Sequence, residues 1–370
     1  MLLAAWPYQN MVNPFQYLSE GSRILWISWK NKLREKRYPG SAEEICQQII
    51  RDCWNGRFFQ TSTDNFPQFW TRDFGFCVQS LMKLGYKNEV HHTLRYALNH
   101  FKEQGKITTT ITPQGKPYDF PTFAADSLPW LIHAIRAAKF PLGAYKFFLA
   151  KELEKYFEKV IVPSTGLVRP DLHISSIKDF ARRKSSCYDN CMVGLLAKDL
   201  AQLELRNPLA AYNYADLIKR HFWNGKYFYD DLRKGQYVAG DANVFPFLFS
   251  FGSKEMLKSA GSEMQAAGLD KPFPLKYTSS RKGVDFIWQE KLGMSDYESD
   301  AIWTHLGLLY VKVLAAVDEG KAKEYKEKYK ILIEKQGNFL EVYAADGKPY
   351  ATWFYQSSPG MLWAANYLKL

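Results

Sequence analysis

Residues 300–317 read DAIWTHLGLLYVKVLAAV, and residues 320–335 read GKAKEYKEKYKILIEK. The first stretch is apolar on almost every side, whereas the second places its apolar residues at helical spacing on one face and Lys and Glu on the other. A helix that is apolar all round is buried, and a helix with one apolar stripe packs on a core while facing water. This pair therefore predicts an inner helix followed by an outer helix.

The same alternation runs along the whole chain. Apolar helices are predicted after long polar loops that are rich in aromatic residues, and amphipathic helices follow short turns. The first amphipathic helix opens with a capping box formed by Ser41 and Glu44. The predicted helices span 41–53, 72–84, 87–101, 126–138, 142–160, 186–205, 208–222, 242–251, 253–267, 300–317, 320–335 and 358–369. Such a pattern predicts a closed ring of inner and outer helices, with the long loops gathered on one face to build a site.

Domain organisation is simple. Short segments with strand character lie inside the predicted loops, at residues 58–60, 107–111, 227–229 and 339–343. No Gly/Ser-rich linker or shift in composition divides the 370 residues. The sequence therefore predicts an N-terminal arm over residues 1–40 and a single all-α domain over residues 41–370.

The composition favours a protein that handles sugars over one that binds nucleic acid. Aromatic residues make up 16% of the chain, and although most are expected to fill the core, aromatic faces also stack on sugar rings. The net charge is +11, but Lys and Arg alternate with Glu on predicted helix faces, which is typical of solvated surfaces. We expect a carbohydrate partner and no nucleic-acid partner.

Cysteine usage and the lack of apolar runs bear on location. The five cysteines are an odd number without a CxxC pair, which predicts neither a zinc site nor a disulfide framework. The first residues lack the basic leader of a signal peptide, and no apolar run approaches the roughly 20 residues that cross a bilayer. These features predict a cytoplasmic protein with no membrane partner, and they leave the oligomeric state open.

Trp70-Thr71-Arg72-Asp73 is the first candidate segment for binding. An Arg–Asp pair at the start of a helix can hold two adjacent sugar hydroxyls, because the guanidinium donates and the carboxylate accepts. Trp70 would provide a stacking wall. The alternative is that Asp73 caps its own helix and Arg72 lies on the surface.

The segment from Tyr118 to Trp130 is the second candidate. Asp126 precedes an apolar helix, so helix capping is the favoured interpretation, and contact with a substrate hydroxyl is the alternative. Tyr118 is a candidate aromatic contact to the sugar.

Two isolated carboxylates are candidates for acid and base. Asp189 lies between Tyr188 and Asn190 at the start of an apolar helix, whose N-terminus favours the charged carboxylate while aromatic burial opposes it. Glu341 lies between Leu340 and Val342, and burying a charge without a purpose is costly. Glu298 is a reserve acid. Further candidates for substrate contact are Tyr188, Asn190, Glu298, Trp303 and Tyr355.

Together these segments resemble those of the six-hairpin (α/α)6-toroid glycosidases, which include trehalase, processing α-glucosidase, glucoamylase and amylo-α-1,6-glucosidase. Trp70 to Asp73 is similar to the element that binds the nonreducing-end sugar. The Tyr188-Asp189-Asn190 segment is similar to the one bearing the catalytic acid, and Phe339 to Tyr343 is similar to the one bearing the catalytic base. The resemblance covers residues 40–370 and departs from the family pattern at Lys184 to Cys187, upstream of Asp189.

The resemblance implies an all-α (α/α)6 toroid of about twelve helices and an inverting hydrolase of α-glucosides or short α-glucans. Asp189 would protonate the glycosidic oxygen and Glu341 would activate a water, without metal or organic cofactor. Two alternatives remain open. The same ring carries sugar epimerases, for which His305 is the residue of interest here, and a noncatalytic ring could bind glycans without turnover.

Overall fold

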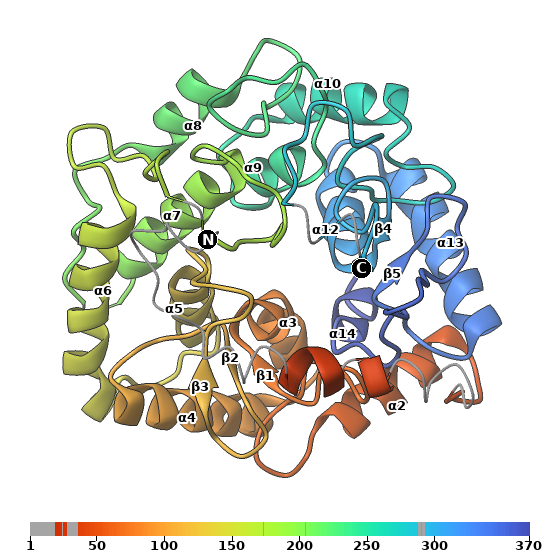
Figure 1. Cartoon of the computed structure of the whole chain (residues 1–370), viewed down its shortest axis with the longest axis horizontal. Helices are drawn as coiled ribbons and strands as arrows, with labels where there is room; N and C mark the ends of the chain where they lie inside the picture. Colours follow the sequence, from red (N-terminus) through yellow and green to blue (C-terminus); the bar gives the residue numbers. More distant parts are fainter. Residues whose placement is uncertain are drawn as a thin grey trace, which may run out of the picture.

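The computed structural model describes residues 19–23, 25–27, 36–172, 174–203, 205–287, 290 and 293–370. Its helices form two concentric rings, as Figure 1 shows in a view onto the ring. This arrangement confirms the prediction of an all-α (α/α)6 toroid. The predicted boundary at residue 40 stays a prediction, and much of the predicted arm lies outside the described residues.

The inner ring closes on itself. Each of its helices contacts the next one around the ring, and the last contacts the first. Its members are α3 (Thr71–Lys83), α5 (Ser127–Ala137), α7 (Cys187–Leu200), α9 (Phe245–Leu248), α12 (Thr304–Leu314) and α14 (Ala364–Tyr367). The predicted apolar helices thus lie in the inner ring, because only there are all their sides covered.

Amphipathic helices form the outer ring, and each precedes its inner partner in the chain. They are α2 (Ala42–Cys53), α4 (Lys87–Gln104), α6 (Lys146–Val160), α8 (Tyr214–Phe222), α10 (Lys254–Ala266) and α13 (Glu319–Gln336). The predicted capping box at the start of α2 is present, with Ser41 and Glu44 bonded reciprocally. Short 3₁₀ turns, η1 (Gly143–Tyr145) and η2 (Asp241–Asn243), precede α6 and α9.

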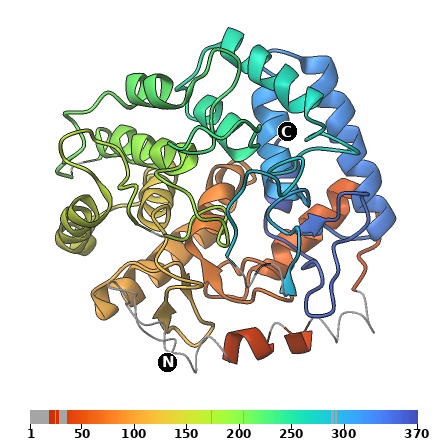
Figure 2. The same cartoon turned by 45° about the horizontal axis from the view of Figure 1, so that its top comes forward.

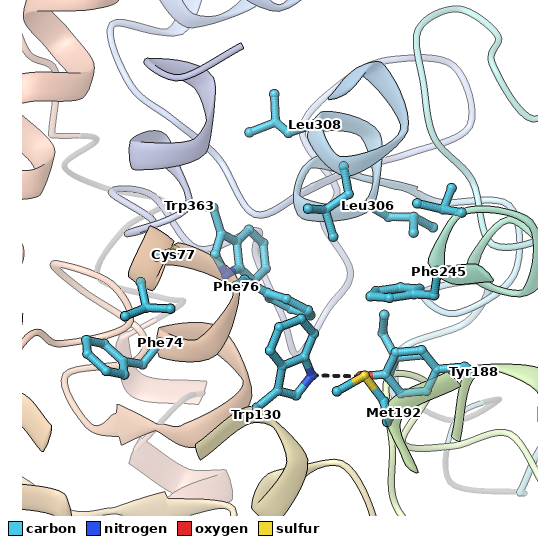
Figure 3. Close-up of a cluster of buried hydrophobic side chains, with 14 of the residues drawn as sticks. Phe74, Phe76, Cys77, Trp130, Tyr188, Met192, Phe245, Leu306, Leu308 and Trp363 are labelled. Atoms are coloured by element: carbon cyan, nitrogen blue, oxygen red, sulfur yellow. Dashed lines mark hydrogen bonds between the residues drawn. The ribbon is translucent and has the colours of Figure 1, made fainter. Parts of the chain in front are cut away.

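The centre of the ring is filled by side chains from the inner helices (Figure 3). Phe76 packs edge-on against Trp130, with ring centroids 4.8 Å apart. The Trp130 indole N–H donates to the Tyr188 hydroxyl at 3.1 Å, so these two buried polar groups are paired. Aromatic side chains of the inner helices therefore fill the axis of the ring and form an aromatic plug, so the ring has no open channel at this point.

Long loops join each outer helix to its inner partner, and they gather on one face, as the turned view of Figure 2 shows. Short strands tie them together. β1 (Phe69–Trp70), β2 (Thr110–Ile111) and β3 (Pro117–Tyr118) form an antiparallel sheet, and β4 (Ile302–Trp303) pairs with β5 (Val342–Tyr343). The second sheet brings distant parts of the chain into register, with Ile302 opposite Tyr343.

Several predicted boundaries differ from the structure. The helix predicted at 300–317 begins only at Thr304, because Ile302 and Trp303 pair with β5. The helix predicted at 358–369 is reduced to α14, because the backbone before it bonds to the loop around Thr61. The helix predicted at 242–251 is split between η2 and α9. The strands predicted at 58–60 and 227–229 make single bridges only.

Gly307 permits close packing between α12, α13 and the loop before β4. A Cβ at this position would overlap the Tyr329 hydroxyl and the Pro274 carbonyl oxygen. We expect Gly307→Ala to lower the free energy of unfolding by about 2–3 kcal/mol, because a packed core cannot absorb the added methyl. Urea denaturation would measure the change.

Gly261 in α10 provides the matched control. A Cβ there would lie 3.7 Å from the Tyr310 hydroxyl, which is ordinary van der Waals contact. Gly261→Ala is therefore expected to be neutral or to stabilise the protein by up to about 1 kcal/mol. Equal stabilities for the two variants would contradict the packing assigned to Gly307.

The described cysteines, Cys46, Cys53, Cys77, Cys187 and Cys191, are all free and buried. The described helices include none with the length and apolarity that crossing a membrane requires.

Candidate active site

A cavity of about 280 Å³ opens at the N-terminal ends of the inner helices, among the long loops. Its charged lining residues are Arg72 and four carboxylates, Asp73, Asp179, Glu298 and Glu341. They come from α3 and from the loops before α7, α12 and α14. Concave sites with a few convergent polar groups are where ligands bind.

Glu341 lies immediately before β5 and is 3% exposed. Its Oε1 accepts the Tyr297 hydroxyl at 2.6 Å, and its Oε2 accepts the Tyr355 hydroxyl and the Ser358 N–H. Burial raises the pKa of Glu341, and these three donors oppose the rise. A carboxylate has about four acceptor positions, so three bonds leave one for a water or a substrate hydroxyl.

Asp179 lies in the loop before α7, and its side chain is 25% exposed. Its Oδ1 accepts the Ser175 hydroxyl and lies 3.6 Å from a guanidinium nitrogen of Arg72. In the described part of the chain, its Oδ2 has no hydrogen-bond partner. Burial raises the pKa of Asp179, against the lowering effect of Arg72. This carboxyl thus faces the cavity with a free oxygen and a pKa above its usual value.

Glu298 binds the backbone of the segment that carries Asp179. Its two oxygens accept the N–H groups of Asp179 at 2.6 Å and Phe180 at 2.8 Å. Burial raises the pKa of Glu298 to about 8, and the neighbouring Asp179 adds to the rise. An isolated carboxyl loses its proton near its ordinary pKa. Two neighbouring carboxyls repel each other when both are charged, so the pair keeps one proton to a higher pH.

Buried ion pairs fix the rest of this loop. The Lys178 ammonium is fully buried and contacts Asp230 at 3.1 Å and Asp241 at 2.9 Å. Arg183 also contacts Asp241, at 2.9 Å. Because an unpaired buried charge is costly, these contacts fix the segment on both sides of Asp179.

Asp126, which is not among the residues that line the cavity, binds the Arg72 guanidinium. The Arg72 Nε donates to Asp126 Oδ2 at 2.6 Å, and the same oxygen accepts the Tyr188 hydroxyl at 2.7 Å. The interpretation of Asp126 as a capping residue is wrong, because its side chain makes no capping bond to α5. It orients Arg72, which in turn places a positive charge beside Asp179.

Asp73 lies beside Arg72 at the start of α3. Its Oδ1 accepts the Trp363 indole N–H at 3.0 Å. Burial raises the pKa of Asp73 to about 7, with Arg72 opposing the rise and Glu341 adding to it. Asp73 therefore faces the cavity near Glu341 and has one oxygen left for a ligand hydroxyl.

The cavity floor is aromatic. His305 stacks on Phe76, with centroids 5.1 Å apart and planes 13° apart, and it contacts Trp303 and Trp363 edge-on or tilted. Its Nε2 lies 3.3 Å from the Tyr277 hydroxyl, whereas its buried Nδ1 has no hydrogen-bond partner among the described residues. Burial lowers the pKa of His305 well below its usual value, so the imidazole is neutral.

The structure brings together most of the residues predicted to form the site. Seven of them line the cavity: Trp70, Arg72, Asp73, Glu298, Trp303, Glu341 and Tyr355. Five are not among the lining residues: Tyr118, Asp126, Tyr188, Asp189 and Asn190.

Asp189 lies at the start of α7, outside the lining residues of the cavity, and its buried Oδ1 has no hydrogen-bond partner among the described residues. Its N–H donates to the Ser186 hydroxyl oxygen at 3.0 Å, and its carboxylate accepts the Ser186 O–H, as in a capping pair. Asn190 bonds to Ser185 and to the backbone of Ser186 and Val168. Burial raises the pKa of Asp189 to about 6, and Arg183 opposes the rise.

Asp179, Tyr297 and Trp363 line the cavity but were not predicted from the sequence. One signal for Asp179 is present: it lies in the long loop before an apolar helix, between Lys178 and an aromatic residue. In the described part of the chain, no group of three or more His, Cys, Asp or Glu side chains is arranged to hold a metal ion.

Comparison with known proteins identifies the fold. No protein-family model and no curated protein matches the sequence. A rhamnosidase from Klebsiella oxytoca with rhamnose bound matches the structure with a TM-score of 0.62 at 10% identity, over 90% of this chain and 65% of that chain. A bacterial glucoamylase complexed with acarbose gives 0.61 at 12% identity, over 88% of this chain and 54% of that chain. The chain thus spans less than two thirds of both.

A third protein matches over nearly its whole length. GH63 mannosylglycerate hydrolase from Thermus thermophilus, in complex with Tris and D-glycerate, gives a TM-score of 0.57 at 12% identity, over 88% of this chain and 98% of that chain. These proteins share the six-hairpin glycosidase toroid, so the predicted resemblance in fold is confirmed.

Proposed function

We propose that this protein is an inverting glycoside hydrolase that removes a sugar from the nonreducing end of an α-glycoside. The observation that carries the proposal is the contrast between two carboxyl groups in one cavity. Burial raises the pKa of both groups, but Asp179 keeps a free oxygen that faces the cavity, whereas Glu341 lies in a frame of three hydrogen-bond donors that oppose the rise. An acid and a base with different environments are what glycoside hydrolysis requires.

In the proposed reaction, Asp179 gives its proton to the glycosidic oxygen as the bond from that oxygen to the anomeric carbon breaks. A water bound to Glu341 attacks the anomeric carbon from the opposite face and passes its proton to Glu341. The products are the free sugar with inverted configuration and the free alcohol. Inverting enzymes separate the two carboxyls by roughly 6.5–9.5 Å so that the water fits between them.

We assign the acid to Asp179 instead of Asp189 or Glu298. Asp189 is not among the residues that line the cavity, and it bonds to Ser186 at the start of its own helix. Both oxygens of Glu298 accept backbone N–H groups. Asp179 alone of these three combines a place in the cavity with an oxygen that has no partner in the described part of the protein.

The sugar is proposed to be glucose. Similar structures include a bacterial glucoamylase complexed with acarbose, the neutral trehalase from Saccharomyces cerevisiae and the GH63 mannosylglycerate hydrolase in complex with glucose. A closed aromatic floor with Asp73 and Arg72 beside it suits one terminal sugar ring, because the ring stacks on the aromatic faces while its hydroxyls meet the polar pair.

Proton NMR of the anomeric signals from time zero would test the proposal, with trehalose, maltose, isomaltose, maltotriose and glucosylglycerate as substrates. Early β-glucose from an α-glucoside is the expected result. Early α-glucose would contradict inversion. A sugar that changes identity without cleavage would support an epimerase, and binding without turnover would support a noncatalytic glycan-binding protein.

The epimerase alternative is less well supported. The family resemblance associates that activity with pairs of histidines, and among the described residues that line the cavity His305 is the one histidine. Its pKa is lowered by burial and by Arg72, and its Nε2 contacts Tyr277.

Glu298→Gln is expected to move the alkaline limb of the pH–rate profile to lower pH. The acid works only while protonated, so activity falls as pH rises through its raised pKa. When the shared proton lies on Asp179, Glu298 carries the negative charge that opposes its loss. Glu298→Gln removes that charge, so the Asp179 proton leaves at lower pH, by about one unit if the repulsion is about 1.4 kcal/mol. The pH dependence of kcat would measure the shift.

Glu152→Gln is the matched control for Glu298→Gln. Glu152 is also buried, but it pairs with Lys155 on α6 and is not a lining residue of the cavity. Its replacement is expected to leave the profile unchanged. An alkaline limb that stays in place in Glu298→Gln would contradict the proposed coupling.

A further inference from the structure

A second cavity of about 280 Å³ lies at the opposite ends of the inner helices. Phe76 lines both cavities, so the aromatic plug of the ring separates them (Figure 3). The front cavity is lined by four carboxylates and one Arg, whereas five basic residues line the rear one. These are Lys83, Arg136, Lys198, Lys312 and Lys369.

One side-chain carboxylate, Asp199, lines the rear cavity, and it is already paired. It contacts Arg136 and accepts from His133 at 2.8 Å. The Lys198 ammonium donates to the Phe249 carbonyl at 2.6 Å. Among the described residues, none of the four lysines has a carboxylate partner within ion-pair distance.

Helix dipoles explain part of this pattern but not all of it. Four of the basic residues lie in the last turns of α3, α5, α7 and α12, where a cation stabilises the helix end. Outer helices also end in basic residues, such as Lys335 in α13. The outer helices, however, are spread around the rim of the ring (Figure 1). The ends of the inner helices line one cavity.

The side chains of the four lysines reach solvent, but Lys312 is held there at a cost in free energy. Desolvation lowers the pKa of Lys312, and the nearby positive charge of Lys83 lowers it further. Like charges gathered in a concave, partly apolar site attract anions strongly, because low-dielectric walls focus the field. Phe76, Trp130 and Phe249 supply such walls.

We propose that the rear cavity binds a small phosphate-bearing anion through the ammonium groups of Lys83, Lys312, Lys198 and Lys369. Lysine binds phosphate as a point charge with three donors, so several lysines can share one phosphoryl group. The anion would neutralise the positive charge of the four lysines. In a phosphate ester, the organic part could pack against Phe76, Trp130 and Phe249. The ligand is inorganic phosphate or pyrophosphate, or a phosphorylated sugar.

Thermal unfolding and titration calorimetry would test the site with pyrophosphate, inorganic phosphate and glucose 6-phosphate, with ionic strength held constant by KCl. We expect a saturable rise in Tm with at least one of them, because a ligand that binds only the folded state stabilises it. Binding of pyrophosphate or phosphate alone indicates an inorganic ligand. Binding of glucose 6-phosphate alone indicates a phosphate ester.

The double variant Lys83→Gln/Lys312→Gln is expected to weaken the affinity at least tenfold. The matched control is Lys219→Gln/Lys335→Gln, which removes two lysines from the last turns of outer helices and should leave the affinity unchanged. The proposal is overturned if no phosphate compound gives a saturable shift in the wild-type protein. Unchanged affinity in the Lys83/Lys312 variant would also overturn it, because the lysines would then serve only their helix ends.

Discussion

Glu341→Gln is expected to lower kcat by about 10²–10⁴-fold, the range that a positioned general base contributes. The amide cannot accept the proton of the attacking water. Its shape nevertheless fits the same site, because the amide oxygen can accept from Tyr355 and Ser358 as Oε2 does. The Tyr297 hydroxyl can rotate to accept from the amide nitrogen. The variant should therefore keep its affinity for the sugar while losing turnover.

Steady-state kinetics, sugar affinity and Tm would be measured together for Glu341→Gln. Folding raises the pKa of Glu341, so its ionised form is disfavoured in the folded state relative to the unfolded chain. A neutral Gln is therefore expected to keep or raise Tm at neutral pH, which separates lost chemistry from lost stability. The proposed base would be excluded if Glu341→Gln retained more than about a tenth of wild-type kcat, a loss too small for a general base.

The second large expected effect is on the kcat of Asp179→Asn, and it is to be compared with the kcat of Asp189→Asn. With a poor leaving group such as a sugar, Asp179→Asn is expected to lower kcat by about 10²–10⁴-fold, because the departing oxygen is no longer protonated. With a 2,4-dinitrophenyl glycoside the loss should be much smaller, since that leaving group departs without a proton. This dependence on the leaving group is specific to a general acid.

Asp189→Asn is the matched control, because it makes the same change in a buried carboxyl ten positions further along the chain. The Asn side chain can still accept the Ser186 hydroxyl bond. Its kcat is expected to stay within about tenfold of wild type for both classes of substrate, since one altered hydrogen bond is worth about 1 kcal/mol. A leaving-group effect in Asp189→Asn and none in Asp179→Asn would reverse the assignment.

Glu341 stands out in the sequence for a simple reason. It is a single carboxylate between Leu340 and Val342, and such a charge is tolerated in a buried strand only where the fold supplies donors. The donors themselves, Tyr297 and Tyr355, lie 44 and 14 positions away, on different loops. The local pattern therefore pointed to Glu341, and to Tyr355 as a substrate contact, but not to the frame of donors that the two tyrosines form around Glu341.

The proposed acid illustrates the opposite case. Asp189 has the local features of a helix-start carboxylate, and those features describe its bonds to Ser186. Asp179 has weak local features, and it reaches the cavity because its loop is held by distant partners. Glu298 binds its backbone from 119 positions away, and Lys178 contacts Asp230 from 52 positions away.

The sequence alone determined the alternation of apolar and amphipathic helices, and with it the double ring and the face on which the long loops gather. Those properties follow from local periodicity, since each helix shows in its own residues how many of its sides are covered. Only the tertiary structure decided which carboxylates share the cavity and that Asp126 orients Arg72 instead of capping α5. Side chains that meet in a ring come from loops far apart in the chain, so their distances depend on contacts that no local pattern contains.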